Sequence, residues 1–325
     1  MEVNNNNLTR SGIVLSLIVP VYNRPAEVRE LLTSLALQTD PDFELLIVED
    51  GSDVPCDAIV REFADRLNVQ YLSKPNSGPG PSRNFGAAAA KGNYFVFLDS
   101  DCVIPPGYVA CVRSRLSAAW VDAFGGPDAA APDFSDMQKA VSYSMTSFFT
   151  TGGIRGGGEK MDKFYPRSFN MGFSREVFEA TGGFSGMRYG EDIDMSIRIL
   201  EYGFQTALLK EAFVYHKRRT SLSAFFRQVY HSGGARIDLQ HRHPGSLKAV
   251  HALPAIFTIG CAAILLPGLL GRPVWLTPLG LYALILFADS LRVTRSFKVA
   301  LLSIVTSYTQ LLGYGSGFLA GMLKK

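Results

Sequence analysis

Residues 94–101 read YFVFLDSD, and the fold prediction begins from this stretch. Tyr94 to Leu98 is an unbroken apolar run, which is typical of a strand buried on both faces of a sheet. Asp99 and Asp101 follow at once, separated only by Ser100. In open parallel sheets, ligands bind beyond the carboxyl ends of the strands. The stretch therefore predicts a buried strand with a candidate site at its end.

The chain on both sides of this strand alternates between expected strands and expected helices. Apolar runs predict strands over 14–21, 43–48 and 69–72, and apolar helical faces predict helices from Pro25, over 59–67 and over 81–91. Such alternation indicates an α/β fold with a mostly parallel sheet and helices on both faces. Polar pairs also follow two other strands: Tyr22-Asn23 and Glu49-Asp50. We expect the three strand ends to converge on one site.

Composition narrows the class of protein. The 325 residues carry a formal net charge of +3, with 19% charged and 47% hydrophobic residues. These values exclude a disordered tail and a basic nucleic-acid arm, so we expect no nucleic-acid partner. The four cysteines show no CxxC spacing, which disfavours a structural zinc site or a disulfide scaffold.

The small net charge conceals a division of the chain. Up to Ala212 there are 19 basic and 27 acidic residues, a net charge of −8. From Phe213 onward there are 13 basic and 2 acidic residues, a net charge of +11. An acidic front part and a basic, largely apolar back part suggest two environments.

Three apolar runs without charged residues occupy the back part: 250–270, 274–288 and 299–322. A membrane-spanning helix needs about 20 apolar residues. The middle run reaches this length only by taking in Asp289, which we expect to face a neighbour or the headgroups. We predict about three transmembrane helices, over 250–271, 273–292 and 298–323. The alternative, a soluble helical core, would have to bury three such runs.

Basic residues predict the orientation of these helices. Seven of them lie between Lys217 and Lys248, ahead of the first run, and three more separate the second and third runs. Positive charge favours the cytoplasmic side, so we expect a multi-pass protein of the cytoplasmic (inner) membrane with its front domain in the cytoplasm and its C-terminus outside. The first eleven residues are polar, so we expect no cleavable signal.

A basic amphipathic helix is expected between the two parts, over 222–239. Such a helix lies in the membrane interface, although an ordinary helix on the domain surface would show the same pattern. The expected organisation is a front domain over 1–220, an interfacial linker over 221–248 and a transmembrane region over 249–325.

Asp99 and Asp101 can both reach one hard cation. Two carboxylates leave coordination positions for phosphate oxygens, which suits Mg²⁺ or Mn²⁺ bridging a diphosphate. The alternative interpretation of Asp99-Ser100-Asp101 is a turn that carries two solvated acids.

Five motifs, in this order, resemble those of the family 2 glycosyltransferases, which have a GT-A fold. They are Val19-Pro20-Val21-Tyr22-Asn23, Val48-Glu49-Asp50-Gly51-Ser52, Gly80-Pro81-Ser82-Arg83-Asn84, Phe97-Leu98-Asp99-Ser100-Asp101 and Gly190-Glu191-Asp192. The resemblance covers residues 15–216, and the apolar back part is similar to that of membrane-attached bacterial members. The QxxRW box of processive members is absent after Gln228, which favours addition of a single sugar.

The resemblance implies a nucleotide-sugar site. Pro20, Tyr22 and Asn23 would line the base and ribose pocket, and Asp50 would accept a hydrogen bond from the base. We favour uracil and a UDP-sugar, although guanine also offers donors to a carboxylate. Arg83 would approach the base or the diphosphate. The remaining implied donor residues are Asp99, facing the ribose, and Asn170, lining the sugar pocket.

The resemblance also implies a cation site and a catalytic base. Asp101 would ligate Mg²⁺ or Mn²⁺, with Asp99 beside it and His216 as a further ligand. Asp192 would accept the proton of the acceptor hydroxyl, with Glu191 as the second choice or as a residue that orients the acceptor. Acids at a helix N-terminus also serve as caps, so a purely structural role for both stays open.

The resulting hypothesis is an inverting, metal-dependent glycosyltransferase. It would transfer a single sugar from a nucleotide sugar to a lipid-linked or cell-envelope glycan at the cytoplasmic membrane face. A polyprenyl phosphate is the alternative acceptor. Two other classes remain open: a sugar-1-phosphate nucleotidyltransferase, although its Gly-rich signature is absent near the first strand, and an inactive membrane scaffold.

Overall fold

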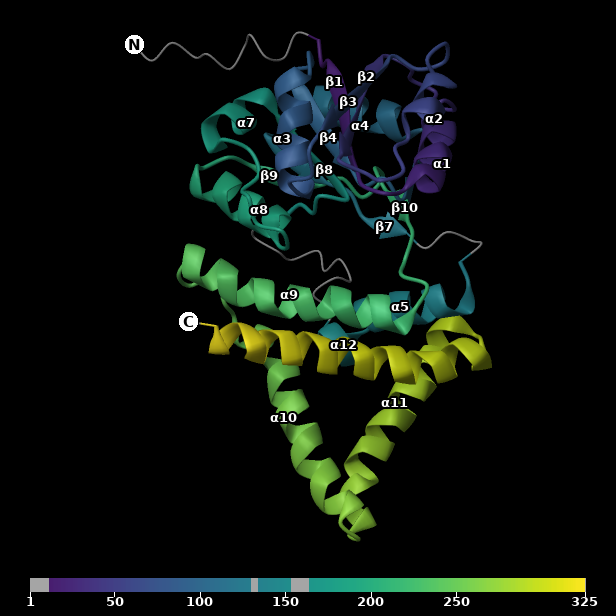
Figure 1. The fold of residues 1–325 in the computed structure, drawn as a ribbon, viewed down its shortest axis with the longest axis vertical. Helices are drawn as coiled ribbons and strands as arrows, with labels where there is room; N and C mark the ends of the chain where they lie inside the picture. The colour runs from purple at the N-terminus through teal and green to yellow at the C-terminus, as the bar shows by residue number, and fades with distance from the viewer. Residues whose placement is uncertain (1–11, 130–133, 153–163, 325) are drawn as a thin grey trace. The chain divides into compact units, whose positions relative to one another are not determined.

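The structure, a computed structural model, describes residues 12–129, 134–152 and 164–324 (Figure 1). The chain forms two compact units: the first contains residues up to 129 and 162–216, and the second contains 130–161 and 217–325. The change between units at 216–217 lies close to the boundary expected at 220. The transfer of 130–161 to the second unit was not expected, because this stretch carries no long apolar run.

A seven-stranded sheet forms the centre of the first unit, in the order β3-β2-β1-β4-β8-β6-β9. Its parallel half contains β1 (Leu15–Val21), β2 (Phe43–Asp50), β3 (Val69–Lys74) and β4 (Tyr94–Leu98). In the other half, β8 (Asn170–Ser174) runs antiparallel to β4 and β6 (Ala123–Gly125), and β9 (Thr206–Leu208) is parallel to β6. The predicted α/β fold with a mostly parallel central sheet is confirmed.

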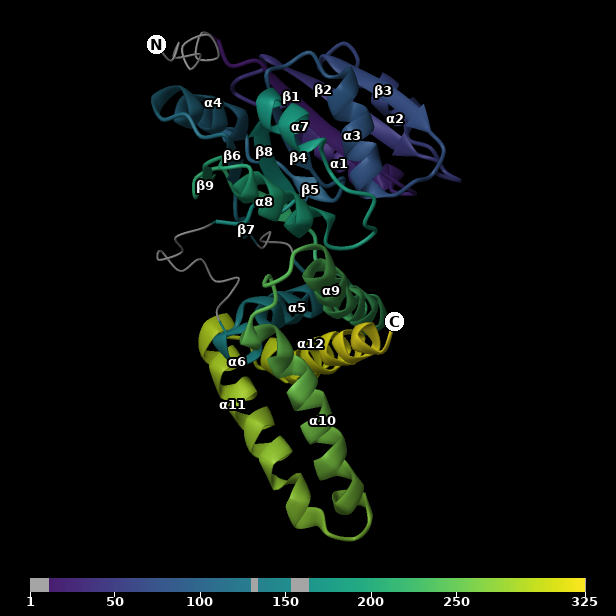
Figure 2. The ribbon, with the colours of Figure 1, turned by 90° about the vertical axis from the view of Figure 1, so that its left-hand side faces the viewer.

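Helices cover both faces of this sheet (Figure 2). One face is covered by α1 (Pro25–Leu35), α2 (Asp57–Arg61) and α4 (Tyr108–Ala118), and the other by α3 (Pro79–Ala89), α7 (Arg175–Thr181) and α8 (Glu191–Glu201). Side chains alternate along a strand, so Leu17 and Val19 of β1 join one core and Ile18 joins the other. The helix expected over 59–67 is shorter and ends at Arg61.

A small second sheet positions the candidate site. It contains β5 (Cys102–Val103), β10 (Val214–His216) and β7 (Asp128–Ala129), with β10 in the middle. In the antiparallel register of β10 and β5, His216 lies opposite Cys102. This pairing brings a histidine from far along the sequence next to the aspartates that follow β4.

The second unit is entirely helical in its described residues. It contains α5 (Asp136–Thr146), α6 (Phe148–Thr151), α9 (Leu222–Arg242), α10 (Ala249–Leu269), the 3₁₀ helix η2 (Pro273–Leu276), α11 (Thr277–Thr294) and α12 (Phe297–Leu323). Both views show α12 beside α9 and α5, whereas α10 and α11 run away from this layer as a hairpin (Figures 1 and 2). The helix expected over 222–239 is therefore present as α9.

Hydrogen bonds hold α5 within this unit. The Tyr143 hydroxyl lies 2.8 Å from Oδ2 of Asp289 in α11. The Thr306 hydroxyl of α12 donates to the carbonyl of Ala140 over 2.9 Å. Asp289 faces a neighbouring helix, as expected of an acidic residue at the end of an apolar run.

Two helices, Ala249–Leu269 and Pro273–Thr294, are long and apolar enough to cross a membrane, judged by length and composition. The third apolar run, predicted as a span over 298–323, does not pass the same test and forms α12. One side of α12 is buried against its neighbours, including Ser303, Thr306 and Ser307. Judged by length and composition together, α12 therefore falls short of the two candidate spans, and it packs along other helices of the second unit.

Candidate active site

The ends of three neighbouring parallel strands carry the candidate residues. Tyr22 and Asn23 follow β1, Asp50 closes β2, and Asp99 follows β4. Since β2, β1 and β4 are adjacent and parallel, their carboxyl ends meet along one edge of the sheet. The expected convergence of three strand ends is present.

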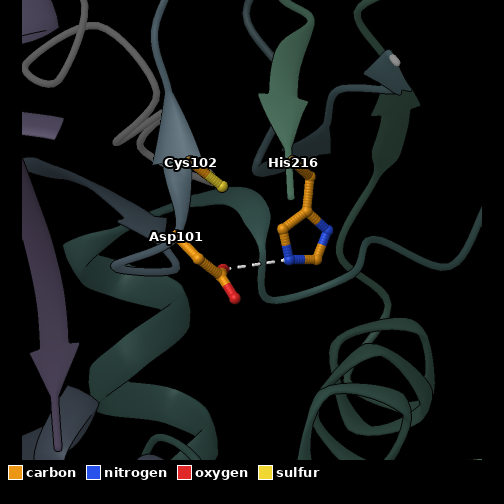
Figure 3. A group of neighbouring side chains, drawn as sticks. All are labelled: Asp101, Cys102 and His216. Carbon is orange, nitrogen blue, oxygen red and sulfur yellow. Dashed lines mark ion pairs between the residues drawn. The ribbon is translucent and has the colours of Figure 1, made fainter. Parts of the chain in front are cut away.

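Asp101 and His216 form the centre of the site (Figure 3). Nε2 of His216 lies 3.1 Å from Oδ1 of Asp101 and 3.9 Å from Oδ2 of Asp99. The imidazole stacks on Phe169, with ring centroids 5.1 Å apart, which holds the ring toward the two carboxylates. The predicted trio of Asp99, Asp101 and His216 is thus brought together.

The donor set of this cluster fits a hard divalent cation. Ligand atoms of Asp101, Cys102 and His216 lie within 4.8 Å of one another. Burial raises the pKa of the Cys102 thiol well above its usual value. Its Sγ lies 3.6 Å from the carbonyl of Phe169. Together with Asp99, Asp101 and His216 offer two carboxylates and an imidazole, and the carboxylates suit Mn²⁺ or Mg²⁺ better than a thiophilic metal.

Asp101 also contacts Arg24, which lies just before α1. Nη1 of Arg24 donates to Oδ2 of Asp101, so the carboxylate is bound on both oxygens. Burial raises the pKa of Asp101, but the hydrogen bond from His216 and the charge of Arg24 lower it more, and the pKa lies well below its usual range. Asp101 is therefore an ionised carboxylate at any physiological pH.

Arg83 of α3 connects the end of β4 to the start of α8. Its Nη1 donates to Glu191 over 2.8 Å and its Nη2 donates to Asp99 over 2.9 Å. The guanidinium is buried and lies 5.3 Å from the ring centroid of Phe184. Nε of Arg83 is buried without a hydrogen-bond partner in the described residues. Both carboxylates are held in place by one planar cation.

Asp50 accepts hydrogen bonds from three donors. They are Nζ of Lys74 and the backbone amides of Ser77 and Gly78, at 2.9 and 2.8 Å for the amides. Burial raises the pKa of Asp50, but these donors outweigh it and hold the pKa below its usual range. The Ser82 side chain also lowers this pKa, so the Asp50 carboxylate lies in a ring of donors at the end of β2.

Asn23 has a left-handed backbone, with φ of +53°, at the turn after β1. Its side-chain oxygen accepts from the amides of Asp53 and Val54, at 2.8 and 3.2 Å. These bonds join the turn after β1 to the loop after β2. Tyr22 is 48% exposed beside this turn, so its ring is available for stacking, and Pro20 lies at the last part of β1.

Asp192 lies in the first turn of α8 and pairs with Arg167. Nε of Arg167 donates to Oδ2 of Asp192 over 2.7 Å, and the side chain of Asp192 is 13% exposed. Burial raises the pKa of Asp192, but the charges of Arg167 and Arg83 lower it more, and the net shift is downward. For Glu191, burial outweighs Arg83 and the pKa is raised. The pKa values of the two neighbouring acids are thus shifted in opposite directions.

Asn170 is fully buried, and both ends of its amide are used within the first unit. Its Oδ1 accepts from the Tyr108 hydroxyl over 2.6 Å, and its Nδ2 donates to the carbonyl of Ala212 over 2.8 Å. Asn170 lies opposite Leu98, next to the end of β4, and its amide joins α4 to the segment before β10.

Comparison with known sequences identifies the family. The profile of "Glycosyl transferase family 2" matches residues 16–182, half of the chain. The chain belongs to glycosyl transferase family 2. An uncharacterized glycosyltransferase of Haemophilus influenzae is 44% identical over 94 residues, 28% of this chain and 31% of its own length. The putative glycosyltransferase EpsH of Bacillus subtilis is 40% identical over 95 residues, 29% of this chain and 28% of its own length. The match therefore spans less than a third of either relative.

Solved structures of glycosyltransferases share the fold of this family 2 chain. The mannosyltransferase PcManGT of Pyrobaculum calidifontis, in complex with GDP-Man and Mn²⁺, has a TM-score of 0.65 at 18% identity, covering 92% of this chain and 88% of its own. TarS of S. aureus in complex with UDP has a TM-score of 0.50 at 19% identity, covering 96% and 92%. At these identities the likeness shows the GT-A-like fold alone.

Three side chains at this family 2 site were not predicted: Arg24, Lys74 and Arg167. Each pairs with a predicted acid, namely Asp101, Asp50 and Asp192. Arg24 directly follows the Val19–Asn23 motif, so its position was a usable signal. Lys74 and Arg167 lie outside every motif, and only the tertiary structure reveals them.

Proposed function

We propose that this chain is an inverting, metal-dependent glycosyltransferase that moves a single sugar from a nucleotide sugar to an acceptor. The observation that supports it most is the convergence of Asp99, Asp101 and His216 at the end of β4, beside the buried Arg83 pair with Glu191. This arrangement would combine ligands for a cation with a guanidinium, that of Arg83, close to where a diphosphate would bind. Membership of the family and the GT-A-like fold agree with it.

The donor would bind across the strand ends. The exposed ring of Tyr22 would stack on the base, and the ionised carboxylate of Asp50 would accept an N–H from it. Uracil offers one such N–H, so a UDP-sugar remains our preferred donor. Asn23 would act by shaping the pocket, because its oxygen is occupied by the loop after β2. Asp99 would face the ribose beside Arg83.

Asp101 and His216, with Asp99 beside them, are the residues that would hold Mg²⁺ or Mn²⁺. Such a cation neutralises the negative charge that develops on a departing diphosphate. The downward pKa shift of Asp101 keeps its carboxylate ionised, and stacking on Phe169 keeps His216 directed toward it.

Asp192 would accept the proton from an acceptor hydroxyl as that oxygen attacks the anomeric carbon. Direct attack from the face opposite the diphosphate would invert the configuration. Arg167 orients the Asp192 carboxylate through Oδ2. Glu191 would act indirectly, because its hydrogen bond to Arg83 links α8 to Asp99.

The second unit would place the protein in the cytoplasmic membrane, with the first unit in the cytoplasm. In this proposal α10 and α11 cross the bilayer, and their apolar side chains are largely exposed, for example Leu266 at 65% and Leu284 at 64%. Because α12 runs along α9 and across the α10–α11 hairpin, it would lie at the membrane surface. Two spans replace the three expected and return the C-terminus to the cytoplasmic side.

The acceptor would be lipid-linked or part of a cell-envelope glycan, because a membrane-held site meets such substrates at the bilayer. One observation favours a polyprenyl phosphate as the second candidate: the pKa of Asp192 is lowered by Arg167 and Arg83, after burial raises it, so its carboxylate is a weak base. A phosphate acceptor is already ionised and needs no base. With that acceptor, Asp192→Asn would retain turnover, whereas with a hydroxyl acceptor it would not.

A donor screen on the purified chain in detergent tests the proposal. Mn²⁺-stimulated release of a nucleoside diphosphate from UDP-sugars is the expected result. Release of pyrophosphate from a nucleoside triphosphate and a sugar phosphate would instead indicate a nucleotidyltransferase. Nucleotide binding without any release, across all donors and acceptors, would indicate an inactive scaffold.

A further inference from the structure

Arg24 was not among the predicted site residues, yet its side chain contacts the Asp101 carboxylate. It is the residue before α1 and directly follows the left-handed Asn23. Its Nη1 contacts Oδ2 of Asp101, while Oδ1 of the same carboxylate lies 3.1 Å from Nε2 of His216. The carboxylate that we assign to a divalent cation therefore already neutralises a fixed positive charge.

A guanidinium and a divalent cation on one carboxylate repel each other. The side chains of Arg24 and Asp101 are 28% and 11% exposed, so water screens this repulsion only in part. Repulsion between the guanidinium and the cation therefore opposes cation binding for as long as Arg24 contacts Asp101.

Arg24 differs in this respect from the other arginine of the site. Arg83 is held by two carboxylates and lies against Phe184, with a side chain only 3% exposed. Among the described residues, the hydrogen bond of the Arg24 side chain is to Asp101 alone. Moving Arg24 therefore breaks one ion pair, and the partly exposed side chain has space toward solvent.

We propose that Arg24 couples cation binding to donor binding. Before the donor binds, Arg24 holds Asp101 and weakens the affinity of the site for a lone cation. The diphosphate of the donor then offers the guanidinium a new anionic partner, so that Asp101 becomes available to the cation. This inference rests on the proposed nucleotide-sugar site and assigns to Arg24 a positioning role that acts through Asp101.

Thermodynamic linkage makes the consequence measurable without turnover. If the nucleotide removes Arg24 from Asp101, it raises the affinity of the protein for the cation. The cation then raises the affinity for the nucleotide by the same factor. A site in which Arg24 has no charge should lose the part of this mutual effect that Arg24 supplies, whereas direct contact between the cation and the diphosphate would remain.

The test is a titration of Mn²⁺ alone, followed by electron paramagnetic resonance, on the full chain in detergent with and without UDP or GDP. We expect Arg24→Gln to bind lone Mn²⁺ about tenfold more tightly than the wild type, the size of effect that one nearby charge has on an ionised group. The enhancement by nucleotide should fall by a similar factor. Arg24→Lys, which keeps the charge, should retain most of the coupling.

Arg29→Gln is the matched control, because Arg29 lies on α1 and its ion pair with Glu62 is on the surface. Equal Mn²⁺ affinity and equal coupling in Arg24→Gln and Arg29→Gln would overturn the role of Arg24 while leaving the proposed function intact. A wild-type protein that binds neither Mn²⁺ nor nucleotide would overturn the proposed function as well. If Arg24→Gln fails to fold, loss of coupling in Arg24→Lys would still contradict the proposal.

Discussion

At the scale of single residues, Arg83 shows how the site is organised. One guanidinium holds Asp99 after β4 and Glu191 at the start of α8, two acids that lie far apart in the sequence. Burying a charge is costly unless it is paired, and here each terminal nitrogen has a carboxylate. Arg83 therefore ties Asp99, at the end of β4, to the helix that carries Asp192.

Asp101→Asn should weaken Mn²⁺-dependent binding of the nucleotide by about tenfold or more, because the change removes the negative charge shared by Arg24 and the cation. Isothermal titration calorimetry with UDP, with and without Mn²⁺, measures the effect. Asp57→Asn is a suitable control, since Asp57 pairs with Arg61 on the surface of α2. An unchanged affinity in the presence of Mn²⁺ would remove Asp101 from the cation site.

Asp192→Asn should leave UDP binding intact and lower turnover on a hydroxyl acceptor by about 10²–10⁴-fold, the usual contribution of a positioned base. Steady-state release of the nucleoside diphosphate measures turnover, and calorimetry measures binding. Glu179→Gln, on the exposed surface of α7, should change neither. Near-normal turnover with a hydroxyl acceptor would exclude Asp192 as the base.

Arg167→Gln should shift the acid limb of the kcat profile to higher pH by about one unit or more. Burial raises the pKa of Asp192, and the charge of Arg167 is the largest factor that lowers it. Without Arg167 the pKa rises, so Asp192 is protonated, and inactive as a base, at a higher pH. Arg167→Lys should restore most of the original profile. A purely structural role for Arg167 predicts lower activity with an unmoved limb.

At the scale of elements, the contact between α9 and α12 depends on glycine. A Cβ on Gly317 of α12 would lie 1.8 Å from the carbonyl oxygen of Tyr230 in α9. A Cβ on Gly233 of α9 would lie 2.1 Å from the carbonyl oxygen of Tyr314. The two backbones approach closely on both sides of the contact, as small residues allow. The four-residue spacing of Gly313, Gly317 and Gly321 therefore serves packing within the second unit.

Gly317→Ala should destabilise the protein by about 1–3 kcal/mol, because the new methyl group meets backbone that cannot move independently of its helix. The thermal unfolding midpoint in detergent measures the change. Gly280→Ala is the matched control in α11, where a Cβ would meet nothing within 4 Å. Equal midpoints for both variants would show that α9 and α12 are not in backbone contact.

At the scale of the whole molecule, the second unit contains chain from two separate stretches, 130–161 and 217–325. Tyr143 of α5 bonds to Asp289 of α11, and Thr306 of α12 bonds to the backbone of α5. The stretch between β7 and β8 thus contributes helices to the unit that carries the candidate spans. We expect mutations in α5 to affect the stability of the second unit more than donor binding.

Thiol labelling tests the proposed topology in cells and inverted vesicles. Lys324→Cys should react with an impermeant reagent only from the cytoplasmic side, and Arg272→Cys, between α10 and α11, only from outside. Both positions are exposed. A Cys111→Ser background removes the native thiol that is partly exposed, since the other three are buried. Labelling of Lys324→Cys from outside would contradict the two-span topology and support three membrane-spanning helices.

Local sequence was sufficient to predict the parallel strands, the polar groups at their ends and the pair Asp99–Asp101, because these features depend on short-range apolar patterning and neighbouring positions. Only the tertiary structure decided that Arg24 shares Asp101 with His216, that Arg83 meets Glu191 108 positions away, and that α12 lies along α9. An apolar run indicates that a helix is shielded from water, but not whether lipid or another helix shields it. That choice, like the pairing of distant charges, is made by packing between segments that the sequence keeps apart.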